Sequence, residues 1–217
     1  MAVSKNKPKN NYKGDKTKVS GYDVCQTPPH AIEPIIEILK YFVHSTPGDA
    51  IIWESASGPE ELLVNALRNE HFEVLATDLL IGYNFFEYSP RFIYPSQAIV
   101  QVTNPPWSIK YDWIEESFRK GFPFALLVPF ETAAAGKFQT LARKYHNNPY
   151  SIDILDLQRR INFKMPNKGW SNSAAQMPTM WLMWGLPVDL EYEPIANFYS
   201  VPMRNVKYND DNTEKSK

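Results

Sequence analysis

Short apolar runs alternate along this chain with longer segments in which apolar residues recur at every third or fourth position. The short runs have the length of buried strands, and the longer segments have the period of amphipathic helices. No internal repeat is visible in the sequence. An alternation of this kind is typical of α/β domains with a mostly parallel sheet. The sequence therefore predicts one α/β domain.

The same pattern places the individual elements. Pro34 is tolerated only in the first turn of a helix, so the regular part of the first helix should begin a few residues after position 30. Residues 158–178 are largely polar and lack a sustained period, and a loop of that length is usually functional or mobile. Strands are expected at 50–53, 73–77, 98–102, 124–128, 152–157 and 179–184, and helices at 30–43, after Pro59, at 111–120 and at 133–145.

The composition excludes several classes of protein. With 217 residues, 43% of them hydrophobic, the chain is too rich in core-forming residues to be disordered or fibrous. It lacks both a long apolar run and a signal peptide, so we expect a cytoplasmic protein that does not enter a membrane. The single cysteine, Cys25, forms no internal disulfide, and with four scattered histidines it makes no metal site.

The net charge of −1 hides an asymmetry. Residues 1–18 carry six lysines against Asp15, a charge of +5, whereas the remainder has 17 basic and 23 acidic residues, a charge of −6. Any contact of the body with a polyanion must therefore be local. We expect a disordered basic tail at 1–20, one domain at 21–203 and a second disordered end at 204–217. The tail is either a solvated leader or an arm that contacts phosphates.

A proline-rich motif comes directly after the expected strand at 98–102. It reads Asn104-Pro105-Pro106-Trp107. An Asn carbonyl accepts a hydrogen bond from an amine, prolines leave main-chain carbonyls without competing donors, and a Trp ring offers a stacking face. The motif suits a planar group that bears an amine; the alternative is a stiffened strand exit with a half-buried Trp.

Polar residues follow the first two strands as well. Residues 54–59 read Glu-Ser-Ala-Ser-Gly-Pro and join the first strand to a helix, and Asp78 ends the second strand. N–H groups at a helix start suit a carboxylate or phosphate, and Asp78 is placed to accept both hydroxyls of a ribose. Because parallel strands end at one edge of a sheet, a nucleoside site is predicted there. Upstream, Thr27 precedes a helix and could simply be its N-cap, and downstream the pair at 85–86 could belong to the core.

The order of these features resembles that of the S-adenosylmethionine-dependent amino methyltransferases. The likeness is greatest to small phage-encoded DNA N6-adenine enzymes whose cofactor half precedes the Asn-Pro-Pro motif, and it spans about residues 20–185. It implies a class I methyltransferase, Rossmann-like fold, a three-layer sandwich with a mostly parallel sheet and a C-terminal antiparallel strand. It also implies S-adenosylmethionine as cofactor, DNA as partner and the host cytoplasm as location.

The resemblance further implies roles for individual residues. Asn104 and Pro105 would hold the target amine, Pro106 would complete the motif, and Trp107 would stack on the target ring. The hydrogen bonds would push the amine lone pair out of the ring plane for in-line attack on the sulfonium methyl group. Cofactor contacts would come from Gln26 and Thr27 at the methionine end, Glu54, Ala56 and Gly58 in the turn, Asp78 at the ribose, and Asn84 with Phe85 at the adenine.

Two positions depart from the family pattern. Glu60 stands where a second Gly is usual and could narrow the turn or repel the methionine carboxylate. Asn84 stands where Asp is usual and exchanges a strict acceptor for an amide.

A target base in duplex DNA must be flipped out of the stack, and the strand must then be held by positive charge. The loop at 158–178 offers such a surface, although it could also be an exposed hairpin with a packed Trp. An RNA adenine or a protein glutamine presents the same kind of NH₂ group, and a catalytically inactive binding protein with this fold is a further alternative. The substrate-binding residues expected in the loop are Arg159, Arg160, Lys164, Lys168 and Trp170.

Overall fold

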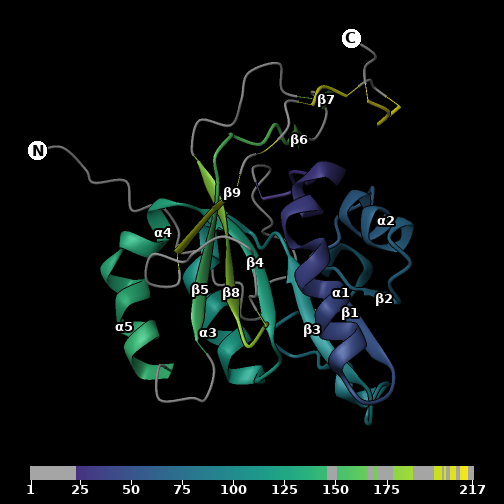
Figure 1. The fold of residues 1–217 in the computed structure, drawn as a ribbon, viewed down its shortest axis with the longest axis vertical. Helices are drawn as coiled ribbons and strands as arrows, with labels where there is room; N and C mark the ends of the chain where they lie inside the picture. The colour runs from purple at the N-terminus through teal and green to yellow at the C-terminus, as the bar shows by residue number, and fades with distance from the viewer. Residues whose placement is uncertain are drawn as a thin grey trace, which may run out of the picture.

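The computed structural model describes residues 23–145, 151–165, 169–170, 178–187, 198–201, 203, 206–208 and 211–214. Its centre is a seven-stranded sheet in the order β2-β1-β3-β4-β8-β5-β9 (Figure 1). Neighbouring strands pair in parallel except β8, which is antiparallel to both β4 and β5. The strands are β1 (Ala50–Glu54), β2 (Val74–Ala76), β3 (Ala98–Thr103), β4 (Phe124–Pro129), β5 (Ile152–Leu157), β8 (Thr179–Trp184) and β9 (Phe198–Val201).

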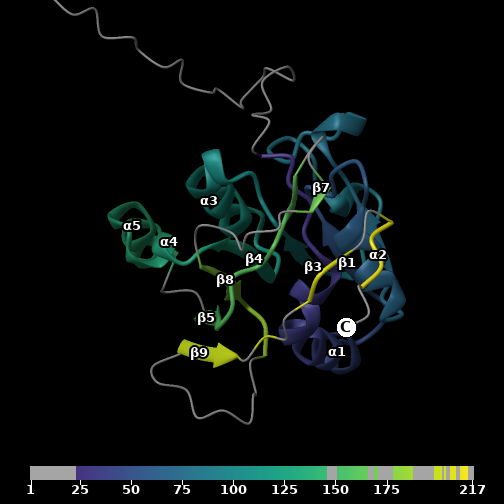
Figure 2. The same ribbon diagram turned by 90° about the horizontal axis from the view of Figure 1, so that it is seen from above.

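Helices cover both faces of this sheet (Figure 2). On one face lie the 3₁₀ helix η1 (Pro29–Ile35), α1 (Ile36–Ser45) and α2 (Leu62–Asn69). On the other lie α3 (Lys110–Lys120), α4 (Glu131–Ala134) and α5 (Gly136–Tyr145). Short 3₁₀ helices η2 (Leu79–Ile81), η3 (Pro90–Phe92) and η4 (Trp107–Ile109) lie in the connections after β2 and β3.

Alternate residues of each central strand point to opposite faces of the sheet and pack in two separate hydrophobic cores. In β1, Ile52 packs with the α1 and α2 side chains, whereas Ile51 and Trp53 pack with those of α3. Because both faces are covered, every residue of β4 and β8 is buried, which is why these strands are continuous apolar runs. The three layers, the mostly parallel sheet and the antiparallel strand confirm the fold expected from the sequence.

Most predicted elements lie within a few residues of their expected positions. Pro34 keeps the first segment in the tighter η1 before the regular helix begins at Ile36, in agreement with the expected late start. The helix expected at 133–145 is divided into α4 and α5 at Ala135, whose backbone is extended. Strand β9 was not predicted, and part of the polar loop forms the short hairpin of β6 (Lys164–Met165) and β7 (Gly169–Trp170).

Part of the C-terminal stretch packs on the domain, in contrast to the disordered end expected from position 204. Val206 and Tyr208 are buried, the Tyr208 hydroxyl oxygen lies 2.9 Å from His30 Nδ1, and its ring stacks on Trp170. The C-terminal stretch is mostly polar, yet Tyr208 within it is buried and anchors the stretch to the domain. The lysines of the basic tail lie outside the described residues.

None of the helices in the described ranges has the length and apolar composition needed to cross a membrane. Within the same ranges, no group of three or more His, Cys, Asp or Glu side chains is placed to hold a metal ion.

Candidate functional site

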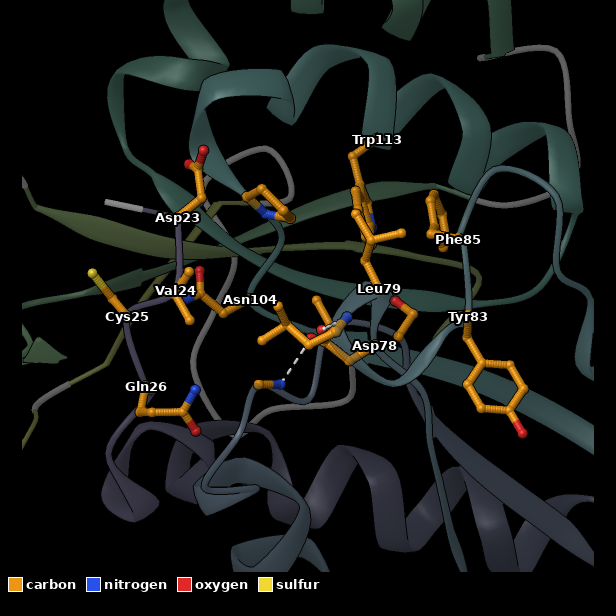
Figure 3. A pocket seen from close by; sticks show the side chains of 15 residues that line it. Asp23, Val24, Cys25, Gln26, Asp78, Leu79, Tyr83, Phe85, Asn104 and Trp113 are labelled. Carbon is orange, nitrogen blue, oxygen red and sulfur yellow. Dashed lines mark hydrogen bonds between the residues drawn. The ribbon is translucent and has the colours of Figure 1, made fainter. Parts of the chain in front are cut away.

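A pocket opens where the parallel strands β1, β2 and β3 end (Figure 3). Asp78 follows β2, Asn104 follows β3 and Gly58 belongs to the turn after β1, and all three line this one pocket. The strand ends thus bring together residues that are up to 46 positions apart in the sequence. Of the predicted site residues, those that line the pocket are Gln26, Ala56, Gly58, Asp78, Phe85, Asn104 and Pro106.

The Asp78 carboxylate joins two of the turns that surround the pocket. Its Oδ2 accepts a hydrogen bond from the Gly58 N–H at 2.9 Å, and its Oδ1 accepts one from the Leu80 N–H at 2.7 Å. These bonds fix the side chain, yet a carboxylate has about four acceptor positions, so each oxygen keeps one for a ligand. Asp78 can therefore accept two hydroxyl groups without losing its place.

Two observations favour glycine at position 58. Its φ is +65°, in the left-handed region that side chains disfavour, and a Cβ there would overlap the Gln26 amide. Gln26 is itself 94% buried, because its side chain lies directly against this glycine. The pocket thus has a floor formed by the Gly58 backbone and a side formed by the Gln26 amide.

Glu54, at the end of β1, lies beneath this floor and outside the pocket lining. Burial raises the pKa of its carboxyl group to about 8, although the nearby Thr103 and the Ala56 N–H, which donates to Oε1 at 3.1 Å, favour the ionised form. Asp78 adds to the rise because it is a second acid close by. Glu54 is therefore largely protonated at neutral pH and holds the turn in shape.

Two stacked rings form an apolar wall of the pocket. Phe85 and Trp113 lie with centroids 3.9 Å apart and planes 4° from parallel (Figure 3). Behind them the Lys120 ammonium group lies 5.0 Å from the Phe85 centroid and donates to the Tyr88 carbonyl at 2.8 Å. Burial lowers the pKa of Lys120 even though Glu116 favours its charge. Both rings are almost fully buried, Phe85 with 3% and Trp113 with 2% of its surface exposed, so they form an apolar side of the pocket with little free ring surface.

Asn104 is oriented by the Trp of its own motif. Its Oδ1 accepts a hydrogen bond from Trp107 Nε1 at 2.9 Å, and the same N–H lies 3.3 Å from the Leu127 carbonyl oxygen. The Trp107 ring packs edge-on against Phe163 and is absent from the pocket lining. Trp107 therefore supports Asn104 from behind, and its stacking on a target ring stays a prediction.

The segment before η1 closes the pocket on the side of the Asn-Pro-Pro-Trp motif. Asp23 accepts hydrogen bonds from the Ser108 N–H at 3.2 Å and hydroxyl at 2.7 Å, immediately after that motif. Cys25 follows in the lining, and burial, with a contribution from Asp23, raises the pKa of its thiol. Residues far apart in the sequence thus share one wall.

Other predicted residues lie around the pocket without lining it. Thr27 and Asn84 are buried, and Asn84 Oδ1 accepts a hydrogen bond from the Phe86 N–H at 3.1 Å. Pro105 is buried beside Pro106. Their contacts with a cofactor or target stay predictions, as does the contact expected for Glu54.

The residues expected to hold nucleic acid are divided among different surroundings. Arg159 and Arg160 are exposed after β5. Lys164 instead donates to Glu60 at 2.6 Å, and Trp170 stacks on Tyr208. Lys168 lies outside the described residues. Only the two arginines therefore present exposed charge among the described members of this set.

Sequence reasoning did not assign several lining residues to the site. Leu79, Leu80 and Tyr83 directly follow Asp78, and this proximity was the signal that could have identified them. Trp113 has the spacing of a core helix residue and gave no such signal. The lining residues outside the predicted set are Asp23, Val24, Cys25, Ser55, Leu79, Leu80, Tyr83 and Trp113.

No family model and no curated protein sequence matches this chain. Among solved structures, it is similar to a Listeria monocytogenes protein provisionally described as a class I S-adenosylmethionine-dependent methyltransferase. The two share 15% sequence identity with a TM-score of 0.49, over 87% of this chain and 68% of the other. The function proposed below is therefore derived from the residues of this chain.

Proposed function

We propose that this protein is an S-adenosylmethionine-dependent methyltransferase that acts on an exocyclic amino group, namely N6 of adenine in DNA. The observation that carries the proposal is that Asp78 and Asn104 line the same pocket. One is suited to the hydroxyls of a nucleoside and the other to an incoming amine. A reaction between two such ligands needs both groups in one cleft.

Several residues of the pocket support this choice of cofactor. Asp78 keeps acceptor positions for ribose hydroxyls, and the largely buried Phe85–Trp113 pair gives the pocket an apolar side for adenine. The Gln26 amide, which has both a donor and an acceptor, lies over the Gly58 turn, where an amino-acid group would be placed. The charge of Glu60, which the sequence suggested could repel a carboxylate, is paired with Lys164.

When bound, the cofactor supplies an electrophilic methyl group. The Asn104 Oδ1 atom, held by Trp107, keeps an acceptor position for the target N–H. A hydrogen bond there strengthens as positive charge develops on the nitrogen, so it favours the transition state over the bound substrate. The rigid prolines on either side keep this acceptor in place, which contributes orientation in the reaction.

We favour DNA because exposed positive charge lies on the loop that leads to the β6–β7 hairpin. Arg159 and Arg160 are exposed on this loop, and the hairpin that follows contacts Gln26 of the pocket wall. The two arginines offer phosphate contacts in a body that is otherwise acidic.

The Asn104→Ala variant tests the catalytic part of the proposal. We expect transfer of the methyl group to fall by about 100-fold or more, while calorimetric affinity for S-adenosylhomocysteine changes less than about threefold. Asn65→Ala, an exposed position on α2, is the matched control and should keep both properties. Cofactor binding without transfer by the wild-type protein would instead identify a binding protein that lacks turnover.

Transfer of tritiated methyl groups to separate pools of DNA, RNA and protein tests the substrate. We expect label in DNA, recovered as N6-methyladenine. Label confined to RNA or to glutamine side chains would contradict the DNA assignment and favour one of the two alternative amine substrates.

A further inference from the structure

Three segments that are distant in the sequence meet at Lys164. Its backbone pairs with that of Gln26 through two hydrogen bonds, with N–O distances of 2.9 and 3.0 Å. Its ammonium group donates to Glu60 Oε2 at 2.6 Å and to Asn212 Oδ1 at 2.9 Å. Lys164 thus connects the pocket wall, the start of the α2 connection and the C-terminal segment.

The pocket wall at Gln26 depends on such external contacts. Residues 23–28 form neither a helix nor a strand beyond the isolated bridge between Gln26 and Lys164. Further contacts on this segment include Asp23 with Ser108 and Cys25 Sγ with Met165 Sδ at 3.2 Å. Met165 lies next to Lys164 in β6, so the hairpin supports two successive residues of the wall.

Lys164 and Glu60 also connect the Gln26 wall of the pocket with the Gly58 turn, and the ligand must contact both. Glu60 lies two residues after Gly58, and Gln26 lies directly against Gly58. The Lys164 backbone holds Gln26, and the Lys164 side chain holds Glu60. The Lys164 side chain is only 14% exposed, so water weakens this ion pair less than it would weaken a pair on the open surface.

We infer that the Lys164–Glu60 ion pair is a positioning device that holds the Gln26 amide over the Gly58 turn and thereby sets the affinity for the cofactor. The inference rests on the proposed function. In this arrangement Lys164 contributes to cofactor binding. Glu60, which stands where glycine is usual in the family, favours cofactor binding through its ion pair. Asn212 completes the arrangement because it contacts both charged groups.

The Glu60→Gln variant distinguishes two possible roles of Glu60, positioning of Gln26 and repulsion of the ligand carboxylate, because they predict opposite changes in affinity. If the ion pair positions Gln26, affinity for S-adenosylhomocysteine, measured by calorimetry without nucleic acid, falls by about three- to tenfold. If Glu60 repels the carboxylate of the ligand, the same variant binds more tightly. An unchanged or a tighter affinity overturns the inference.

Charge exchange provides the second measurement. Glu60→Lys and Lys164→Glu should each weaken binding, the double variant should recover most of the loss, and Lys164→Arg should bind as the wild type does. The matched control is Lys144→Met, which removes a 2.7 Å ion pair between Lys144 of α5 and Glu115 of α3 and should leave affinity unchanged. Any loss should be in KM for the cofactor and not in kcat, because the reacting groups are untouched.

Hydrogen exchange tests the positioning without any ligand. The N–H groups of Gln26 and Lys164 are both hydrogen-bonded across the bridge, and in Glu60→Gln their exchange should be at least about threefold faster. Unchanged exchange overturns the inference. If wild-type protein binds no S-adenosylhomocysteine, the proposed function fails, and the exchange rates still decide whether the ion pair positions Gln26.

Discussion

At the scale of single residues, the pocket depends on carboxyl groups in very different environments. Asp78 faces the pocket and accepts two backbone N–H groups, whereas Glu54 lies beneath the floor with 1% of its surface exposed. Burial raises the pKa of Glu54 to about 8, and no basic side chain in the described ranges is paired with it. Its ionisation is therefore opposed by the fold.

The pH dependence of stability should reveal this buried acid. The unfolded chain loses the Glu54 proton near pH 4.5, but the folded chain keeps it to about pH 8. The folded state thus binds more protons in this window, so its stability falls as pH rises, by up to about 1.4 kcal/mol per pH unit. Glu54→Gln should remove this slope and be more stable than wild type at pH 8.

Urea unfolding from pH 5 to 8.5 measures the difference between the two proteins. Other titrating groups are common to both, so only the change in slope is assigned to Glu54. Parallel curves for wild type and Glu54→Gln would contradict the raised pKa.

Some residues of the pocket could be predicted from the sequence, and others could not. Asp78, Gly58 and Asn104 follow buried strands, and parallel strands end at a common edge, so their proximity follows from the fold class. Trp113 joins the pocket only because α3 turns that face toward Phe85, and its spacing is the same as that of core residues. The contacts of Glu60 with Lys164 and of Trp107 with Phe163 depend on long-range packing that no local pattern contains.

At the scale of the elements, the buried central strands were predicted best. β4 is apolar throughout and β8 is apolar after Thr179, so both can be recognised without partner information. The break at Ala135 and the pairing of β9 with β5 arise from tertiary packing. The burial of Tyr208 was not expected, because the stretch around this ring is otherwise polar.

The Tyr208→Phe variant tests this anchor. Removing the hydroxyl group leaves the ring stack with Trp170 but removes the contacts with the His30 N–H and Nδ1, so the free energy of unfolding should fall by about 1 kcal/mol. Tyr41→Phe, on a residue of α1 that is 57% exposed, is the control and should change stability by less than about 0.5 kcal/mol. Equal urea midpoints for the two variants would show that the C-terminal segment does not pack as described.

At the scale of the whole molecule, the charge is divided between a basic tail and an acidic body. Residues 1–18 have a charge of +5 and the remainder a charge of −6. If the tail contacts DNA phosphates, its deletion should lower the affinity for DNA and reduce the number of counterions that are released from the DNA on binding. We expect the slope of log K against log salt for duplex DNA to become shallower by about two to five.

The binding isotherms at several salt concentrations should be compared with calorimetry for S-adenosylhomocysteine, which the deletion should leave unchanged. An unchanged salt slope would identify the tail as a solvated leader without a part in binding.

The position of β8 in the sheet also has a consequence for how the chain is completed during synthesis. β5 is made before β8, yet it reaches β4 only through β8, which lies between them. Until residue 184 has left the ribosome, β4 therefore presents an open, apolar edge to the cell. β1, β2 and β3 pair with one another from the first half of the chain, so the nascent polypeptide can assemble the ligand-facing half early while the other half waits for a late insertion.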